Sequence, residues 1–137
     1  CACLVGSEMC IRDRYAEIEE NEVRFEELHC EDAEYLIVAF GSCARIAQKA
    51  MEIAREEGIK VGLLRPITLW PFPSKAIAAR AAQVKGILTV ELNAGQMVED
   101  VRLAVECKVP VEHFGRLGGI VPDPDEVITA LKEKLIK

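Results

Sequence analysis

From residue 35 onward the sequence alternates between short apolar runs and longer amphipathic segments, and this alternation limits the folds open to the chain. The apolar runs are YLIVAF at 35–40, KVGLL at 60–64, GILTVEL at 86–92 and the weaker VPVEHF at 109–114. Because the runs are apolar on both faces, they are typical of buried parallel strands. Strands that alternate with helices form right-handed βαβ units, with helices on both faces of one sheet.

The segments between the runs carry helical signals. In the first segment Ser42 is predicted to cap the helix and Gly58 to follow its end. The last helix has the strongest signals, because Asp123 can cap it, Pro124 takes the first helical position and Glu126 completes a capping box. The apolar faces of the four predicted helices are Ile46, Ala50, Ile53 and Ala54; Ile77, Ala81 and Val84; Val98, Val101 and Val105; and Val127, Ile128, Leu131 and Leu135.

A fifth strand is predicted ahead of this pattern. In NEVRFEELHC the polarity alternates with a period of two, which we interpret as Val23, Phe25 and Leu28 on one side and charges on the other. Such half-polar strands lie at sheet edges, commonly antiparallel to their neighbour. We therefore expect an α/β fold with five strands, residues 35–40 at the centre and residues 23–28 antiparallel at one edge.

Composition excludes several classes of function. A chain of 137 residues has room for one domain. The net charge of −6 and the aromatic content of 5% argue against nucleic-acid binding, which needs a basic face and stacking surfaces. No apolar run approaches the length of a membrane span and no signal peptide is recognisable. Cys30, Cys43 and Cys107 are predicted to be buried thiols, so we expect a reducing, cytoplasmic setting.

The chain offers few residues for catalysis. AFGSCAR, at 39–45, follows a strand and opens a helix, so its amides could hold an anion, but a capped turn is favoured because the loop has a single glycine and no Walker lysine. Cys43 could have a lowered pKa at that helix start, yet no histidine or C-x-x-C motif accompanies it. His29 is next to Cys30, and His113 is isolated in the sequence. Neither is accompanied by a second pair of ligands at the spacing of a zinc site.

Three loops at the ends of strands deserve a functional interpretation. Polar side chains gather in VELNAGQM at 90–97, either as a ligand site at the carboxyl edge of the sheet or as a hydrogen-bonded loop or domain contact. In LLRPITLWPFP, Trp70 and Phe72 lie among three prolines and either dock onto another surface or pack back over their own sheet. The loop FGRLGGIVP contains three glycines, which permit unusual dihedral angles.

The segments AFGSCAR, EEGIKVGLLRPITLWPFP, VELNAGQMVEDVRLAV and FGRLGGIVPDPDEV, in that order, resemble the C-terminal domain of the α subunit of 2-oxoacid:ferredoxin oxidoreductases. The resemblance runs from about Tyr15 to the end of the chain. It is strongest to the 2-oxoisovalerate and 2-oxoglutarate types, through RPITLWPFP and NAGQMVEDVRLAV.

The resemblance implies a transketolase C-terminal-like fold, with three α/β/α layers and a mixed five-stranded sheet of order 1-3-2-4-5 whose first strand is antiparallel. It implies a complex, typical of anaerobic metabolism, that oxidatively decarboxylates a 2-oxoacid to acyl-CoA and reduces ferredoxin. Thiamine diphosphate, Mg, iron–sulfur clusters and CoA serve that reaction on other domains and subunits. The expected partners are the thiamine domain of the same subunit, the β and γ or δ subunits and, through the complex, ferredoxin.

No catalytic, cofactor-binding or metal-binding residue is carried over to this chain, which we expect to be inactive alone and to serve assembly. Other readings are the equivalent domain of a transketolase or of a 2-oxoacid dehydrogenase E1 β subunit, and a stand-alone flavodoxin-like module that binds an anion. The candidate interface or carboxyl-edge residues are Gly41, Ser42, Arg45, Arg65, Trp70, Phe72, Glu91, Asn93, Gly95, Gln96, Arg116, Gly118 and Gly119.

The first residues do not belong to the resemblance. Three of the six cysteines fall within the first ten residues, but an iron–sulfur site needs four thiolates, usually with C-x-x-C spacing. CLVGSEMCIRDR instead resembles a translated sequencing adapter, and the first methionine is Met9. We therefore predict that residues 1–14 are not native, are irregular or poorly packed and hold no metal. Residues 15–137 are then the domain, a piece of a longer protein.

Overall fold

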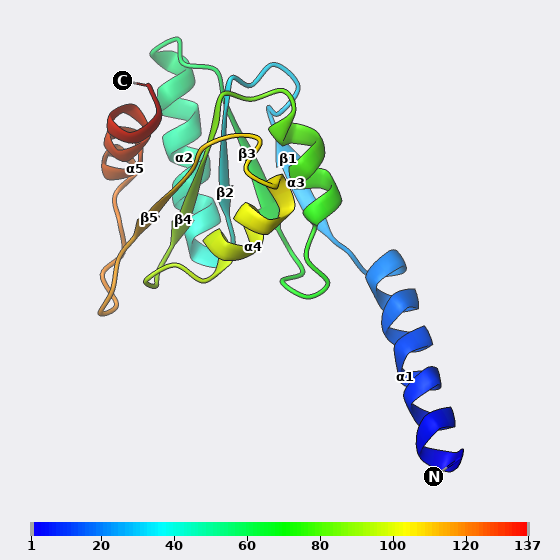
Figure 1. Ribbon diagram of the computed structural model, residues 1–137. Coiled ribbons are helices and arrows are strands. Elements are labelled where there is room, and N and C mark those ends of the chain that lie inside the picture. Colours follow the sequence, from blue (N-terminus) through cyan, green and yellow to red (C-terminus); the bar gives the residue numbers. More distant parts are fainter. Residues whose placement is uncertain (1, 137) are drawn as a thin grey trace.

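The computed structural model describes residues 2–136 (Figure 1). These residues form five strands and five α-helices, followed by a π-helical turn. In chain order these are α1 (Ala2–Asn21), β1 (Phe25–Leu28), β2 (Tyr35–Ala39), α2 (Gly41–Glu56), β3 (Val61–Pro66), α3 (Ser74–Ala81), β4 (Gly86–Glu91), α4 (Met97–Val105), β5 (Val111–Gly115), α5 (Pro124–Leu131) and η1 (Lys132–Ile136).

The five strands form one mixed sheet in the order β1-β3-β2-β4-β5. β2 is the central strand and pairs in parallel with β3 and β4, while β5 pairs in parallel with β4. β1 lies antiparallel to β3 at the edge, with Phe25 opposite Pro66 and Leu28 opposite Leu63. The predicted fold class, strand order and antiparallel edge strand are therefore confirmed.

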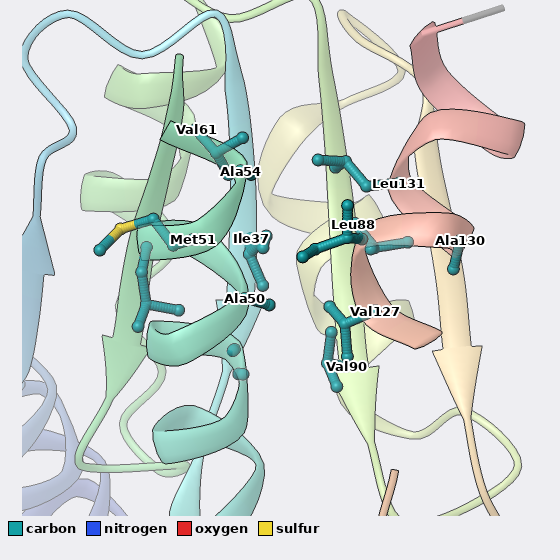
Figure 2. Packing of buried hydrophobic residues seen from close by; sticks show 14 of the residues in the cluster. Ile37, Ala50, Met51, Ala54, Val61, Leu88, Val90, Val127, Ala130 and Leu131 are labelled. Atoms are coloured by element: carbon teal, nitrogen blue, oxygen red, sulfur yellow. The ribbon is translucent and has the colours of Figure 1, made fainter. Parts of the chain in front are cut away.

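Helices cover both faces of the sheet, which makes three layers (Figure 1). On one face α2 and α5 pack over Ile37, Leu63 and Leu88, and Figure 2 shows the buried side chains between them. On the other face α3 and α4 pack over a second cluster that includes Leu36 and Ile87. Each fully buried aliphatic side chain contributes about 1.5–3 kcal/mol, so these two cores hold the sheet edges, and the loops that leave them, in place.

Several local predictions need correction. Ser42 does not cap α2, because the helix begins at Gly41 and its cap position is Phe40, without a side-chain hydrogen bond. Leu28 does not share a face with Phe25; three residues apart, they point to opposite faces of a strand, and Leu28 packs against the α2 side. Cys107 is exposed and lies beyond the end of α4.

Other local signals are confirmed. Gly58 follows the end of α2 in a left-handed conformation, as expected for that position. At the start of α5, Pro124 is the first helical residue and the amide of Asp123 donates to the Glu126 carboxylate at 3.2 Å. The buried face of α4 contains the apolar residues that their spacing predicted, and that of α3 contains Ile77 and Ala81, whereas the predicted Val84 is buried beyond the end of α3.

The start of the chain is helical, so the prediction of an irregular segment is wrong. Residues 8–20 are rich in helix-forming Glu and Arg, and Arg12 pairs with Glu8 one turn earlier. The helix α1 extends away from the sheet (Figure 1), and the side chains described between residues 6 and 17 are exposed. Poor packing is thus confirmed for residue 6 and residues 8–14, while the side chains of residues 1–5 and 7 lie outside the described part, and α1 continues unbroken across residues 14 and 15. A non-native origin of residues 1–14 stays a prediction.

Candidate functional site

The topology brings the candidate residues to one edge of the sheet. β2, β3, β4 and β5 are parallel, so the loops that follow them all leave from their carboxyl ends (Figure 1). This edge carries the start of α2 and the loops at residues 67–73, 92–96 and 116–122. We call it the carboxyl edge, and the opposite one the amino edge.

Glu91, the last residue of β4, is the most organised polar group of the carboxyl edge. Its side chain is fully buried, with 0% exposure. The carboxylate accepts hydrogen bonds from the backbone amides of Gln96, Met97 and Val98 at 3.2, 2.8 and 3.0 Å. These amides are the free donors at the start of α4, where the helix dipole also favours an anion. Glu91 therefore closes the 92–96 loop and leaves this helix start no capacity for an external anion.

His113 lies beside Glu91, a neighbourhood that the sequence did not reveal. Its Nδ1 is 3.4 Å from Glu91 Oε1 and 3.3 Å from Thr89 Oγ1. The Thr89 hydroxyl donates to the carbonyl of Glu112, so it can accept from His113. His113 is thus held by two groups of β4. The signal that could have found it is the register, which sets Thr89 directly opposite His113.

Close packing at Gly115 joins β5 to the 92–96 loop. A Cβ placed on Gly115 would lie 2.3 Å from the Asn93 carbonyl oxygen and 2.5 Å from His113 Nε2. Because real side chains never approach so closely, only glycine fits at this position. Asn93 in turn accepts a hydrogen bond from the amide of Gly95 at 2.7 Å. The hydrogen-bonded loop, one of the two readings of VELNAGQM, is the arrangement observed.

The start of α2 carries Gly41, Ser42 and Arg45 as exposed residues. Cys43 behind them is buried. Burial raises the pKa of the Cys43 thiol, and the negative charge of Glu91 raises it further. The expected lowering at a helix start is therefore wrong, and Cys43 stays a neutral thiol of the core.

The two candidate arginines are engaged in ion pairs. Arg65 belongs to β3 rather than to the following loop, and it bonds Glu26 on the neighbouring β1 at 2.9 Å. Arg116 follows β5 and pairs with Glu126 at the start of α5, at 2.5 Å. This pair lowers the pKa of the Glu126 carboxyl. The glycines that follow, Gly118 and Gly119, have φ of +73° and +77°, as the glycine-rich loop predicted.

Of the two interpretations of this loop, Trp70 fits docking onto another surface and Phe72 fits packing over its own sheet. Trp70 is 55% exposed and meets the ring of Tyr15 from α1 edge-on, at 5.4 Å between ring centroids. Phe72 is half-buried and packs against the α3–α4 side of the core. The loop is therefore anchored by Phe72 and presents Trp70 outward, and the predicted partial exposure of both rings is confirmed.

Trp70 belongs to a larger apolar set that spreads along the carboxyl edge. We call it the apolar edge; its large side chains are between 41% and 62% exposed. It contains Ile67, Leu69 and Trp70 from the loop after β3, Leu92 from the loop after β4, and Leu117, Ile120 and Val121 from the loop after β5. Exposed apolar groups of this extent are typical of surfaces that contact other protein.

Three charged groups of the site are engaged within the domain. Glu91 is saturated by backbone donors, and Arg65 and Arg116 are paired with carboxylates. Among the described residues, no three His, Cys, Asp or Glu side chains gather as metal ligands would. In the same part of the chain, no helix has the length and apolar character to cross a membrane.

Comparison with known proteins identifies the relatives of this chain. The profile of the family "Pyruvate:ferredoxin oxidoreductase core domain II" matches residues 33–127. The ketoisovalerate oxidoreductase subunit VorB of Methanothermobacter marburgensis is 45% identical over 123 residues, which are 90% of this chain and 35% of that protein. The 2-oxoglutarate synthase subunit KorA of Methanothermobacter thermautotrophicus is 31% identical over 120 residues, 88% of this chain and 30% of that protein.

Solved structures agree with these relatives. A 2-oxoglutarate:ferredoxin oxidoreductase from Magnetococcus marinus, with 2-oxoglutarate, coenzyme A and succinyl-CoA bound, has a TM-score of 0.81 and 25% identity and covers 94% of this chain and 23% of that one. A split-gene transketolase, described as an inactive beta4 tetramer, shares the fold with a TM-score of 0.70, over 82% of this chain and 41% of that one. The chain thus spans about a third of the length of its curated relatives. It belongs to the family of pyruvate:ferredoxin oxidoreductase core domain II.

Proposed function

We propose that this chain is the C-terminal domain of the α subunit of a 2-oxoacid:ferredoxin oxidoreductase and that its role is assembly rather than catalysis. The family match and the 45% identity to a ketoisovalerate oxidoreductase subunit support the first part. The apolar edge supports the second part, the role in assembly, and the proposal rests mainly on this observation. Seven large apolar side chains lie exposed on loops of the carboxyl edge, where Glu91 and Asn93 are already hydrogen-bonded within the domain.

The partner proposed for the apolar edge is the remainder of the same subunit, including its thiamine domain. The curated relatives are about three times as long as the part that matches this chain, so a large body of protein is available to cover the edge. Contacts with the β and the γ or δ subunits would extend the same surface. Trp70 is the expected centre, because exposed aromatic residues contribute most to protein interfaces.

The proposed complex oxidatively decarboxylates a 2-oxoacid to acyl-CoA with ferredoxin as electron acceptor. Of the two substrates that the resemblance suggested, 2-oxoisovalerate is favoured. Two ketoisovalerate oxidoreductase subunits are 45% and 47% identical to this chain over 90% of its length, whereas two 2-oxoglutarate synthase subunits are 31% and 32% identical over 88% and 74% of it. We place the complex in the cytoplasm.

Two features of the domain support placing the cofactors of such a complex elsewhere. Thiamine diphosphate with Mg would need free anion-binding amides and free carboxylate oxygens, but at the carboxyl edge Glu91 already bonds the amides that begin α4. Iron–sulfur clusters need converging thiolates, and Cys30 and Cys43 are buried singly in opposite cores. We therefore assign thiamine diphosphate, Mg, iron–sulfur clusters and CoA to other parts of the complex.

Complementation tests the proposal. The segment of VorB that matches this chain is removed from the ketoisovalerate oxidoreductase of Methanothermobacter marburgensis, and this chain is added back as a separate polypeptide. We expect it to bind the truncated complex and restore viologen reduction that depends on 2-oxoisovalerate and CoA. Alone, the chain should reduce no viologen dye. Turnover by the isolated chain above a heat-killed control would overthrow the assembly role.

Trp70→Ala tests the surface. The variant should bind the truncated complex about ten- to a hundredfold more weakly, since a buried interface aromatic contributes about 1–3 kcal/mol. Its unfolding transition should match that of the parent chain, and Leu103→Ala, an exposed apolar residue of α4 away from the edge, is the matched control. Loss of the folded state in Trp70→Ala would assign the ring to the domain core instead. Stabilisation of the chain by phosphate, nucleotides or CoA would favour the stand-alone anion-binding module.

A further inference from the structure

The edge strand β5 leaves a row of backbone groups facing away from the sheet. The Pro110 carbonyl accepts from Ile87 of β4, and the Arg116 amide donates to the Glu91 carbonyl, so both residues face β4. Alternate residues of a strand direct their backbone groups in opposite directions. The backbone groups of residues 111, 113 and 115 therefore point to the free edge, where an additional strand could pair with them.

Two of these outward carbonyls already accept hydrogen bonds from side-chain cations. Arg102 Nη2, in the last turn of α4, donates to the Val111 carbonyl at 3.3 Å. Lys134 Nζ, in η1, donates to the His113 carbonyl at 2.5 Å. The two cations come from opposite helical layers and converge on the same edge. Both side chains belong to exposed residues, so neither position is explained by burial in a core.

The surroundings of β5 would otherwise suit an added strand. A hollow of about 380 Å³ lies on the α4 side, with Val105, Cys107 and Val109 in its wall, and one of about 450 Å³ lies on the α5 side, with Phe114 and Ala130. Side chains of an added strand would point alternately into the two hollows. Arg102 lines the first hollow and Lys134 the second.

We infer that Arg102 and Lys134 protect the β5 edge against pairing with a strand from a second copy of this chain. By holding the outward carbonyls, they remove acceptors that an incoming strand needs, and they place two positive charges where it would lie. Charged side chains at an edge are a general means of preventing sheet extension. The domain is thereby directed to associate through the apolar edge, on the loops that follow the strands, rather than by pairing strands along β5.

The test compares self-association of the full chain with that of Arg102→Ala/Lys134→Ala, by sedimentation velocity over a range of concentrations. The double variant should self-associate about thirtyfold more tightly, which corresponds to about 2 kcal/mol for the two backbone acceptors released for pairing. Amide hydrogen exchange should show new protection at residues 111–115. Lys49→Ala/Lys75→Ala removes the same charge elsewhere and should behave like the parent chain.

A conservative pair makes the result specific. Arg102→Lys/Lys134→Arg keeps a donor at each position and should stay as the parent chain, whereas simple loss of fold would abolish the native exchange protection of the whole sheet. An unchanged association constant in a folded Arg102→Ala/Lys134→Ala variant overturns the inference. New protection at residues 67–73 instead of 111–115 does so too, because it would place the contact at the apolar edge.

Discussion

The two ends of the sheet differ in what they expose. At the amino edge the loops carry charged residues joined in ion pairs, Arg55 with Asp32, Lys85 with Glu34 and Lys132 with Glu57. At the carboxyl edge the loops expose the seven side chains of the apolar edge, and among the described residues no large exposed apolar side chain lies in an amino-edge loop. The amino edge is thus charged and the carboxyl edge apolar, in keeping with the proposal that contacts with other protein form at the carboxyl edge.

The charged end is also tied to a helix. Arg55 of α2 reaches Asp32 with two nitrogens and also donates to the carbonyls of His29 and Val61, at 2.8 and 2.7 Å. These bonds connect the β1–β2 loop to the start of β3. At the carboxyl edge the comparable fixed point is the buried Glu91. The amino edge therefore has charged groups that are paired within the domain, whereas the carboxyl edge combines a fixed, buried carboxylate with exposed apolar side chains.

The largest expected effect is at Glu91. In Glu91→Gln the amide nitrogen cannot accept a hydrogen bond, so at least one buried amide at the start of α4 loses its partner and the helix loses its anion. We expect a loss of about 2–4 kcal/mol in the free energy of unfolding, measured with urea. Glu99→Gln, which removes an exposed carboxylate from the first turn of the same helix, should cost about 0.5 kcal/mol. Equal losses in the two variants would contradict the role of Glu91 as the buried group that holds the 92–96 loop in place.

A charge added at either end of the sheet tests the difference between the two edges more selectively. Val121→Lys places a cation on the apolar edge, and Gln83→Lys places one on the exposed amino edge. Binding to the truncated ketoisovalerate oxidoreductase should weaken about tenfold in Val121→Lys, through the desolvation of the new charge, and stay unchanged in Gln83→Lys. Both variants should unfold like the parent chain. If Gln83→Lys weakens binding as much, the docking surface does not lie at the carboxyl edge.

The smallest expected effect is the response of the amino edge to acid. Hydrogen bonds from Arg55 and Lys85 lower the pKa values of Asp32 and Glu34. A carboxyl group with a lowered pKa stabilises the fold above its unfolded pKa, about 3.9 for Asp and 4.3 for Glu, and this stability is lost as the pH falls through the folded value. Because the pairs are solvent-exposed, the effect is small and screened by salt.

The measurement is the free energy of unfolding between about pH 6 and pH 2. Arg55→Gln/Lys85→Gln should flatten this profile relative to the parent chain, and Lys75→Gln, which lies away from both pairs, should keep its slope. A parent profile without acid loss would mean that these carboxylates titrate alike in the folded and unfolded chains.

The sequence by itself predicted most of the fold. Strands buried on both faces, amphipathic helices and the capping box at Asp123 are patterns among residues close together in the chain, so they are readable without the tertiary structure. Their strand–helix alternation restricted the sheet to βαβ units, and the family motifs supplied the strand order and the likeness to 2-oxoacid oxidoreductases. The loops at the carboxyl edge were also singled out from the sequence, and their role stays a prediction.

What the side chains of that edge do was decided only by the tertiary structure. The register of β4 and β5 brings Thr89, Glu91 and His113 together, although His113 is more than twenty residues away and had seemed isolated. The pairing of β1 with β3 similarly gives Arg65 its partner. Register and layer packing are set by contacts distant in the chain, and periodicity carries no record of them. Layer packing also gave Trp70 and Phe72 different positions, although they are two residues apart. Trp70 faces outward, and Phe72 packs inward.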